Sequence, residues 1–542
     1  MKHSNIKEGE LKIKITQNLL VSQDVRERKG SFYTPQIWVE LSQKYLADVF
    51  GKNWQNEYYV WDCAAGTGNL LAGLTNKYNI WASTLDKTDV DIMHDRIQNG
   101  ANLLENNVFQ FDFLNDDFTK LPQELQNIIN DPKKRKKLII YINPPYAEHG
   151  NRKTFAGKGE HKAKVSTTSK MYDVFQNIVG TATRELYVQF FLRIYQKIPD
   201  AKLASFSTPK FINAQNFLKF RNYFKAEFLK GFICQANTFD NVNGHFPISF
   251  LIWNLGKKEN ISKINTDVFF HDKDVKFCWQ AGEKTFYATD KKMFISDWLR
   301  EFYDKKDKEI GYIILPGVDM QQQNGVYITS QPTQSDILQH KTSRITKSNL
   351  MEMAIYLTVR QCIKPNWLNN RDQFLYPNNK WEKDLEFQND CLAYTLFNNN
   401  ISSKHGVNHW IPFMENEVNA RNKFESHFMV GFMTGKITQN IYTFEQQEEK
   451  TSINREFSPE AANVFNAGRE LWKYYHKQPN ININASLYDI REYFQGRNDK
   501  GKMNNNSDDE MYNKLIDNLR LALKILAKKT ELKVYEYGFL KE

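Results

Sequence analysis

The sequence is poor in cysteine and has no paired cysteine motif. Five cysteines occur in 542 residues, and no two of them form a C-x-x-C pair. They stand far apart, among aromatic or apolar neighbours, at Cys63, Cys234, Cys278, Cys362 and Cys391. Neither a disulfide-stabilised secreted fold nor a redox-active pair fits this pattern. We interpret the cysteines as reduced core residues of a cytoplasmic protein.

Long hydrophobic runs are also missing. No segment approaches the ~20 consecutive apolar residues that span a bilayer, and the opening residues, MKHSNIKEGELKIK, lack the apolar stretch of a secretory signal. Histidines are scattered, and the nearest approach to a metal-binding pair, His405 and His409, has no accompanying carboxylates. We therefore predict a cytoplasmic protein without a membrane partner and without a bound metal ion.

The sequence does have an excess of positive charge and enough apolar residues to fold. Lys and Arg number 73 against 63 Asp and Glu, a formal net charge of +10, and this sign favours a polyanionic partner. Hydrophobic residues make up 41% and aromatic residues 14%, which excludes a disordered chain. A chain of 542 residues exceeds what one hydrophobic core usually organises, so we expect two domains with appendages.

Polarity and periodicity divide the chain into four regions. Residues 1–30 are polar and form an N-terminal arm, whereas strand-like and helix-like stretches alternate in residues 31–255, each strand ending in a polar or glycine-containing turn. This alternation predicts an open α/β sheet whose ligands gather at the carboxyl edge of its strands. Residues 256–462 are rich in charge, Asn and Gln and show little such alternation, and residues 463–542 look helical.

The first of two motifs that follow apolar strands runs from Asp62 to Asn69 and reads DCAAGTGN. Its small residues let backbone amides approach a ligand closely. It lacks the third glycine of a dinucleotide-binding fingerprint, and an ordinary tight turn remains the alternative. The segment Phe32-Tyr33-Thr34-Pro35 precedes it in the chain, and a Thr-Pro pair is typical of a helix N-terminus.

The second motif, Asn143-Pro144-Pro145-Tyr146, follows the apolar strand KLIIYI. Two prolines stop strand pairing and stiffen the turn, so the Asn projects from a rigid platform. An amino group conjugated to an aromatic ring is a poor nucleophile, but an Asn oxygen and a backbone carbonyl that accept its two hydrogens prepare its lone pair to attack a methyl sulfonium. Tyr146 offers a face on which an extruded base can stack. A Pro-Pro strand terminator with a packed Tyr is the structural alternative.

With these motifs in the order FYTP, DCAAGTG and NPPY, residues 28–255 resemble the gamma-type N6-adenine DNA methyltransferases of restriction-modification systems. The resemblance implies a Rossmann-like, mostly parallel seven-stranded sheet flanked by helices. A mixed α+β target-recognition domain (256–462) and a helical C-terminal region (463–542) are expected to follow. The implied reaction transfers a methyl group from S-adenosyl-L-methionine to the N6 amino group of an adenine flipped out of a specific double-stranded DNA sequence.

The resemblance assigns cofactor contacts to several segments of the catalytic domain. The residues are Tyr33, Thr34, Pro35, Asp62, Ala64, Gly66, Gly68, Asp86, Asp112 and Phe113. Asp62 is expected at the methionyl amino group, and the glycine turn against the methionyl and ribose part. The ribose hydroxyls are assigned to Asp86, with Thr84 as the alternative. Asp112 is expected to accept a hydrogen bond from the cofactor's adenine amino group, with Phe113 beside the ring.

The resemblance also assigns the substrate side of the site. The residues are Asn143, Pro144, Pro145 and Tyr146 for the chemistry, and Tyr146 and Phe239, with Phe246 as competitor, for stacking on the target base. Basic runs at 133–137 and 152–170 flank the NPPY turn in sequence, where a phosphate backbone must pass. Segments 360–384 and 404–413 combine Arg, Asn, Gln, His and aromatic side chains, which can read base edges or stack. A cognate restriction endonuclease that acts separately on the same site is the expected partner.

Two other functions stay open, and one is excluded. A modification or DNA-binding subunit that is active only with a partner can carry the same motifs. Protein-glutamine methyltransferases also present Asn-Pro-Pro-Tyr to an amide nitrogen, but they are compact chains without a large region after the catalytic domain. Cytosine ring methylation needs a nucleophilic Cys, normally in a Pro-Cys pair, and the sequence contains no such pair.

Overall fold

The computed structural model divides the chain into two compact units. It describes residues 34–146, 168–239, 242, 244–272, 277–290, 292–437, 439–442, 448–451 and 453–541. The N-terminal unit comprises Met1–Lys291 together with Asn366–Arg371, and the C-terminal unit comprises Lys292–Pro365 and Asp372–Glu542. The N-terminal unit therefore continues beyond residue 255, where composition places the end of the predicted methyltransferase domain.

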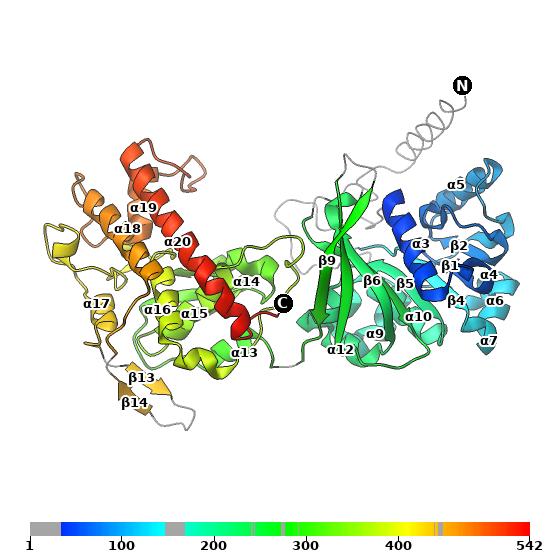
Figure 1. Ribbon diagram of the computed structural model, residues 1–542, viewed down its shortest axis with the longest axis horizontal. Coiled ribbons are helices and arrows are strands. Elements are labelled where there is room, and N and C mark those ends of the chain that lie inside the picture. Colours follow the sequence, from blue (N-terminus) through cyan, green and yellow to red (C-terminus); the bar gives the residue numbers. More distant parts are fainter. Residues whose placement is uncertain are drawn as a thin grey trace. The chain divides into compact units, whose positions relative to one another are not determined.

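The N-terminal unit is built on one sheet with the strand order β3-β2-β1-β4-β5-β7-β6-β8-β9 (Figure 1). Its strands are β1 (Tyr59–Asp62), β2 (Ile80–Thr84), β3 (Val108–Gln110), β4 (Leu138–Ile142), β5 (Lys202–Ser207), β6 (Glu227–Gln235), β7 (Pro247–Asn254), β8 (Lys263–His271) and β9 (Cys278–Tyr287). Pairing is parallel from β3 through β5 and between β6 and β8, whereas β7 and β9 are antiparallel to their neighbours. The predicted mostly parallel α/β sheet is confirmed. Within the described residues the sheet has nine strands instead of seven, because β8 and β9 extend it beyond residue 255.

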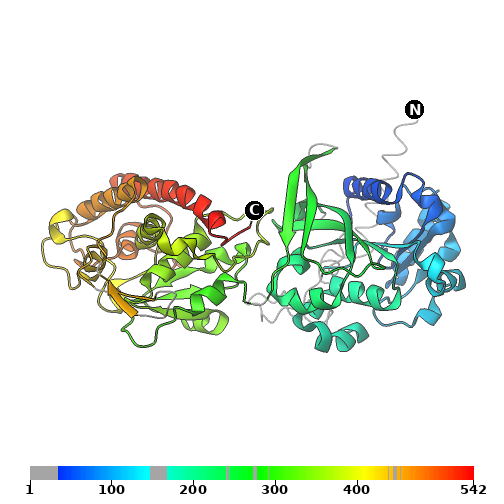
Figure 2. The same cartoon turned by 60° about the horizontal axis from the view of Figure 1, so that its bottom comes forward.

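Helices cover both faces of this sheet (Figures 1 and 2). The described helices of the unit are α3 (Gln36–Phe50), α4 (Trp54–Glu57), α5 (Lys87–Gln98), α6 (Gln123–Asn130), α7 (Pro132–Arg135), α9 (Lys170–Val179), α10 (Leu186–Lys197), α11 (Lys210–Asn213) and α12 (Leu218–Tyr223). Val60 and Ile139 face the core under α3 and α5, whereas Trp61 and Ile140 face the core under α6, α9 and α10. Because the inner strands are buried on both faces, they appear in the sequence as continuous apolar runs.

The C-terminal unit combines small antiparallel sheets with a helical core. Its strands are β10 (Gly311–Leu315), β11 (Tyr327–Thr329), β12 (Lys341–Ile345), β13 (Gln439–Tyr442) and β14 (Glu448–Thr451), and its described helices are α13 (Ile295–Arg300), α14 (Gln334–Gln339), α15 (Leu350–Gln361), α16 (Leu385–Leu396), α17 (Phe428–Met433), α18 (Pro459–Tyr475), α19 (Leu487–Gln495) and α20 (Glu510–Glu536). One hydrophobic core joins α15, α16, α18 and α20. Residue 463, the predicted start of the helical region, falls inside α18 and within this core. Among the described residues, no helix is both long and apolar enough to cross a membrane.

Candidate active site

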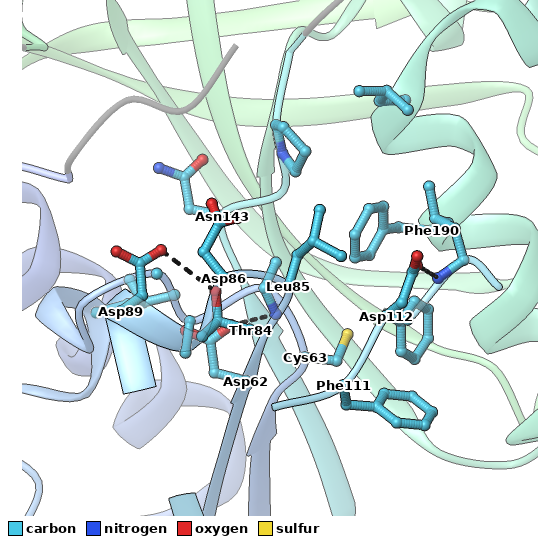
Figure 3. A pocket seen from close by; sticks show the side chains of 18 of the residues that line it. Asp62, Cys63, Thr84, Leu85, Asp86, Asp89, Phe111, Asp112, Asn143 and Phe190 are labelled. Atoms are coloured by element: carbon cyan, nitrogen blue, oxygen red, sulfur yellow. Dashed lines mark hydrogen bonds between the residues drawn. The ribbon is translucent and has the colours of Figure 1, made fainter. Parts of the chain in front are cut away.

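A pocket of about 410 Å³ lies at the carboxyl edge of the parallel strands (Figure 3). The ends of β1, β2 and β4 and the turn after β3 form much of its wall. Ten residues that the sequence singled out line it together: Thr34, Asp62, Ala64, Gly66, Thr84, Asp86, Asp112, Phe113, Asn143 and Pro145. Its volume lies within the range of roughly 300–1,000 Å³ that is usual for small-molecule sites.

Asp62 ends β1 and is almost fully buried at the pocket wall. It is 1% exposed, and its Oδ1 accepts a hydrogen bond of 3.0 Å from the backbone N–H of Ala64. Burial raises the pKa of Asp62 to about 8, and the Ala64 hydrogen bond offsets only part of that rise. A carboxyl group in this environment is suited to a cationic ligand, which would favour its charged form.

The turn after Asp62 needs glycine at two positions, for different reasons. Gly66 and Gly68 have positive φ angles of 51° and 80°, which residues with a side chain rarely adopt. A Cβ atom on Gly66 would meet no atom within 4 Å, and Gly66 lines the pocket. A Cβ atom on Gly68 would lie 3.2 Å from Sδ of Met93 on α5. Gly66 therefore faces ligand space, whereas Gly68 lets α5 approach the turn.

Three polar side chains at the end of β2 line the pocket together. Thr84 ends the strand, Asp86 is the N-cap residue of α5, and Asp89 lies in the first turn of that helix. The Thr84 hydroxyl donates a hydrogen bond of 3.5 Å to Oδ2 of Asp89 (Figure 3). Sequence reasoning proposed Asp86 with Thr84 as its alternative and missed Asp89. The spacing of three residues from Asp86 at a helix start is the signal that could have indicated it.

Asp112 is held in one orientation by the turn that follows β3. Its Oδ1 accepts hydrogen bonds from the backbone N–H groups of Leu114 (3.0 Å) and Asn115 (3.1 Å), and its Oδ2 accepts one of 2.8 Å from Nδ2 of Asn115. A carboxylate has about four acceptor positions, so three bonds leave capacity for a ligand. Asp112 is therefore a pre-oriented acceptor at the pocket wall.

Phe113 belongs to an aromatic wall that the sequence indicated only in part. Its ring stacks on Phe190 of α10, with centroids 5.1 Å apart and an interplanar angle of 12°, and both residues line the pocket. We term these two rings the aromatic wall. Arg193, also on α10, donates hydrogen bonds to the carbonyl oxygens of Phe113 and Asp116 and lies 5.4 Å from the Phe113 ring centroid. Helix α10 thus fixes the turn after β3, a long-range contact without a local sequence signal.

Asn143 directly follows β4, and its carboxamide is held at both ends. Nδ2 donates a hydrogen bond of 2.8 Å to Oγ1 of Thr34, and Oδ1 accepts one of 2.6 Å from the hydroxyl of Tyr146. Burial raises the pKa of Tyr146 well above its usual range, so this hydroxyl stays protonated. Pro144 and Tyr146 are not among the residues that line the pocket. The FYTP and NPPY motifs therefore meet at a single side chain.

The two candidates for the second base-stacking ring differ in burial. Phe239 is 1% exposed and lies edge-on to Phe206, with ring centroids 6.0 Å apart. Phe246 is only partly buried, and the guanidinium of Arg371 lies 5.4 Å from its ring centroid. Neither ring lines the pocket. In this conformation Phe239 is a core residue, and Phe246, the competitor in the sequence, is the more accessible ring.

The basic run at residues 133–137 does not lie beside the pocket. It immediately precedes β4 and therefore stands at the amino end of that strand, on the opposite edge of the sheet from Asn143. Arg135 donates hydrogen bonds to the backbone carbonyls of Pro199 (2.7 Å) and Ile129 (2.9 Å). The expectation that this run guides the phosphate backbone into the site is wrong. The run is close to NPPY in the sequence, but the whole length of β4 separates the two in the structure.

Part of the predicted site falls outside the described residues. This part comprises Tyr33 and residues 152–167 of the basic loop. Thr168 and Ser169, which follow that segment, line the pocket, and Nζ of Lys170 donates a hydrogen bond of 2.9 Å to the carbonyl of Asn115. Within the described part of the chain, no group of three or more His, Cys, Asp or Glu residues is placed to hold a metal ion.

Comparison with known proteins gives only distant matches. No family model and no characterised protein sequence matches the chain. Among solved structures, 47% of the chain aligns with 28% of a chain in the DrdV–DNA complex, at 17% identity and a TM-score of 0.32. Half of the chain (50%) aligns with 69% of a putative class I S-adenosylmethionine-dependent methyltransferase from Listeria monocytogenes, at 14% identity and a TM-score of 0.28. Almost all of it (96%) aligns with 80% of the type IIL restriction-modification enzyme MmeI, solved in complex with DNA, at 11% identity and a TM-score of 0.35. Matches at this level carry no functional weight, and we infer the function from the site itself.

Proposed function

We propose that the chain is a sequence-specific DNA adenine methyltransferase, which transfers a methyl group from S-adenosylmethionine to the N6 amino group of an adenine flipped out of double-stranded DNA. One observation carries this proposal: the carboxamide of Asn143, held at both ends, lines the same pocket as Asp62, Gly66 and Asp112. An oriented amide oxygen beside a cofactor-sized cavity is the arrangement that activation of an aromatic amine requires.

The residues of the pocket fit S-adenosylmethionine. Its methionyl ammonium would favour the charged form of Asp62, whose burial raises the pKa to about 8. Asp86 and Asp89 offer acceptors for the ribose hydroxyls, and the aromatic wall with the pre-oriented Asp112 suits an adenine ring and its amino group. When bound, this cofactor supplies a methyl group on a sulfonium that is activated for transfer.

Asn143 and the backbone carbonyl of Pro144 would each accept one hydrogen of the target amino group. These two bonds withdraw the nitrogen lone pair from the ring and direct it at the methyl group. Thr34 holds Nδ2, so that the acceptor end of the carboxamide is the end available to the amine. Fixing both reactants in contact and in line can lower the barrier by roughly 7–11 kcal/mol. As the nitrogen–carbon bond forms, the carbon–sulfur bond to the methyl group would break and leave its electron pair on the sulfur, which becomes a neutral thioether. The methylated amine would then release its extra proton to water, so no covalent enzyme intermediate is needed.

The contact of Tyr146 with Asn143 bears directly on how a base enters. Its hydroxyl donates to Oδ1 of Asn143, the atom that the amine needs. An amide oxygen has two lone pairs, so the hydroxyl either shares this oxygen with the amine or turns away from it. In both cases the ring stays next to the turn, where it can stack on an extruded base.

The decisive variant is Asn143→Ala in the full chain. DNA from cells that express the wild-type chain alone should carry N6-methyladenine in one sequence context when read by methylation-sensitive long-read sequencing, and DNA from cells with the variant should not. Calorimetry should show that the variant still binds S-adenosylmethionine, because Asn143 positions the amine. Methylation that persists in Asn143→Ala would refute the mechanism.

Further measurements on the wild-type chain and its DNA separate the alternative functions. Nucleoside chromatography of the DNA identifies the modified base, so a mark on an amino group other than that of adenine would correct the substrate. No new mark, together with retained cofactor binding, would favour a modification subunit that needs a partner. Methyl transfer from labelled cofactor to protein but not to DNA would favour a protein-glutamine methyltransferase. A cognate restriction endonuclease would cut only DNA that lacks the mark.

A further inference from the structure

Exposed aromatic rings cluster on the hairpin of β8 and β9. Phe277 is 62% exposed and Trp279 is 44% exposed. Trp279 stacks at 18° on Phe270 of the neighbouring strand, with centroids 6.2 Å apart, and Phe277 lies 6.2 Å from Trp279. Trp367, from the segment Asn366–Arg371, meets Phe270 edge-on at 5.3 Å. We term these four residues the aromatic strip.

The aromatic strip lies at the same edge of the sheet as the NPPY turn. Strand β8 runs parallel to β6, with Val268 beside Ile233. Strand β6 in turn runs parallel to β5 and β4, because β7 between them is antiparallel to both of its neighbours. Phe270 and Trp279 pair near the carboxyl end of β8. The strip therefore shares the carboxyl edge with Asn143.

The separation along this edge matches a short stretch of duplex. Five strand spacings, from β4 through β5, β7, β6 and β8 to β9, lie between the NPPY turn and Trp279. At ~4.8 Å for each spacing the distance is about 24 Å. Since DNA rises about 3.4 Å per base pair, roughly seven base pairs cover it. One duplex bound at the turn can thus reach the strip.

The edge between the two features offers side chains of similar chemistry. Phe246 immediately precedes β7, which starts at this edge. The guanidinium of Arg371 lies 5.4 Å from the Phe246 ring centroid, and the carbonyl of Arg371 accepts a hydrogen bond of 2.8 Å from Nδ2 of Asn213. A guanidinium over an aromatic ring is suited to both phosphates and bases. Aromatic and cationic groups therefore continue from the turn to the strip.

We propose that the aromatic strip is a second DNA-contact site, at which the rings of Phe277 and Trp279 contact the bases of the duplex whose adenine enters the NPPY turn. Every base has a π-face on which such rings stack, and inserted apolar side chains are a known means of opening base steps. Large rings on an edge hairpin otherwise promote self-association. This inference rests on the proposed function, because the duplex at the turn is what brings DNA to the strip.

The test compares two variants of the full chain. Phe277→Ala combined with Trp279→Ala should weaken binding of a short fluorescein-labelled duplex by about tenfold, equivalent to ~1.4 kcal/mol, as measured by anisotropy. Calorimetry should show unchanged affinity for S-adenosylmethionine. The matched control is Tyr78→Ala: Tyr78 is 69% exposed but precedes β2, at the opposite edge of the sheet. The control should bind the duplex like the wild type.

Further outcomes separate this inference from the proposed function. Trp279→Phe keeps an aromatic face. If this variant still binds the duplex, the weaker binding of the double alanine variant results from the missing rings and not from misfolding. If the double variant binds the duplex as well as Tyr78→Ala does, while Asn143-dependent methylation persists, only the strip proposal falls. If the wild-type chain binds no duplex and methylates none, both proposals fail.

Discussion

At Asn143, two hydrogen bonds determine which end of the carboxamide can serve an amine. Thr34 accepts from Nδ2 at 2.8 Å, and Thr34→Val would remove this acceptor while nearly preserving the shape of the side chain. We expect methyl transfer in single turnovers to slow by about 10²-fold, the usual loss for one misplaced hydrogen-bonding group at a reacting centre. Cofactor affinity should stay within about threefold of the wild type, because the defect lies in the chemical step.

The conservative variant Thr34→Ser keeps the hydroxyl and should restore most of the rate. This rescue would identify Thr34 as a positioning residue for Asn143. The opposite split, in which Thr34→Val loses cofactor affinity but keeps its rate, would instead show the direct cofactor contact that the FYTP resemblance implies. Measuring the transfer rate and the cofactor dissociation constant separately therefore distinguishes the two roles.

Asp62 should couple cofactor binding to proton release. Burial raises its pKa to about 8, so at pH 7 the protonated form of this carboxyl predominates in the free chain. A bound ammonium favours the charged form and lowers the pKa, so binding expels the proton. We expect cofactor affinity to rise as pH increases from 6 toward 8. Calorimetry in buffers of different ionisation enthalpy should count close to one proton released at pH 7.

Asp62→Asn provides the control for this coupling. Its neutral amide has no proton to lose, so proton release should fall to near zero and the pH dependence of cofactor affinity below pH 8 should flatten. Affinity should also fall, since the ammonium loses its counter-ion. Wild-type binding without proton release would contradict the assignment of Asp62 to the methionyl amino group.

At the scale of elements, prediction succeeds where a strand carries its own stop signal. The run KLIIYI ends in NPPY, and β4 ends at Ile142 for that reason. Strands β8 and β9 carry no such signal: β8 largely alternates between buried and more exposed residues, and half of β9 is exposed. In composition they are as polar as the rest of the region after residue 255. Only the pairing of β8 with β6 assigns this hairpin to the sheet, with β9 paired to β8, and the contact between β8 and β6 is a long-range one.

The residues of the candidate site also divide into those that the sequence could predict and those that depend on long-range packing. Asp62, Asp112 and Asn143 could be predicted, because polar residues at the carboxyl ends of parallel strands converge on one edge. Phe190 could not, because its place in the pocket depends on how α10 packs against the turn after β3. Phe239 shows the opposite error: its place in the motif order suggested a stacking role, but the sequence did not indicate that its side chain is buried.

At the scale of the whole molecule, the chain leaves the N-terminal unit and later returns to it. The segment Asn366–Arg371 belongs to the N-terminal unit, although both of its flanks belong to the C-terminal unit. Trp367 is 8% exposed and lies in the core of the N-terminal unit against Phe270. No local pattern marks such a return, because NWLNNR has the composition of an ordinary polar loop. The stability of the N-terminal unit should therefore depend on a residue outside its continuous sequence.

Trp367→Ala tests this dependence. Truncating a buried Trp costs roughly 3–5 kcal/mol, and we expect the loss to fall on the N-terminal unit. A single denaturation midpoint does not locate the loss in a chain of two units, so amide hydrogen exchange is the better measurement. Exchange should accelerate in β8 and β9 of Trp367→Ala and much less in Trp367→Phe, which keeps a ring against Phe270. Acceleration confined to the C-terminal unit would show that the segment contributes nothing to the sheet, and that residues 1–291 hold β8 and β9 in place without it.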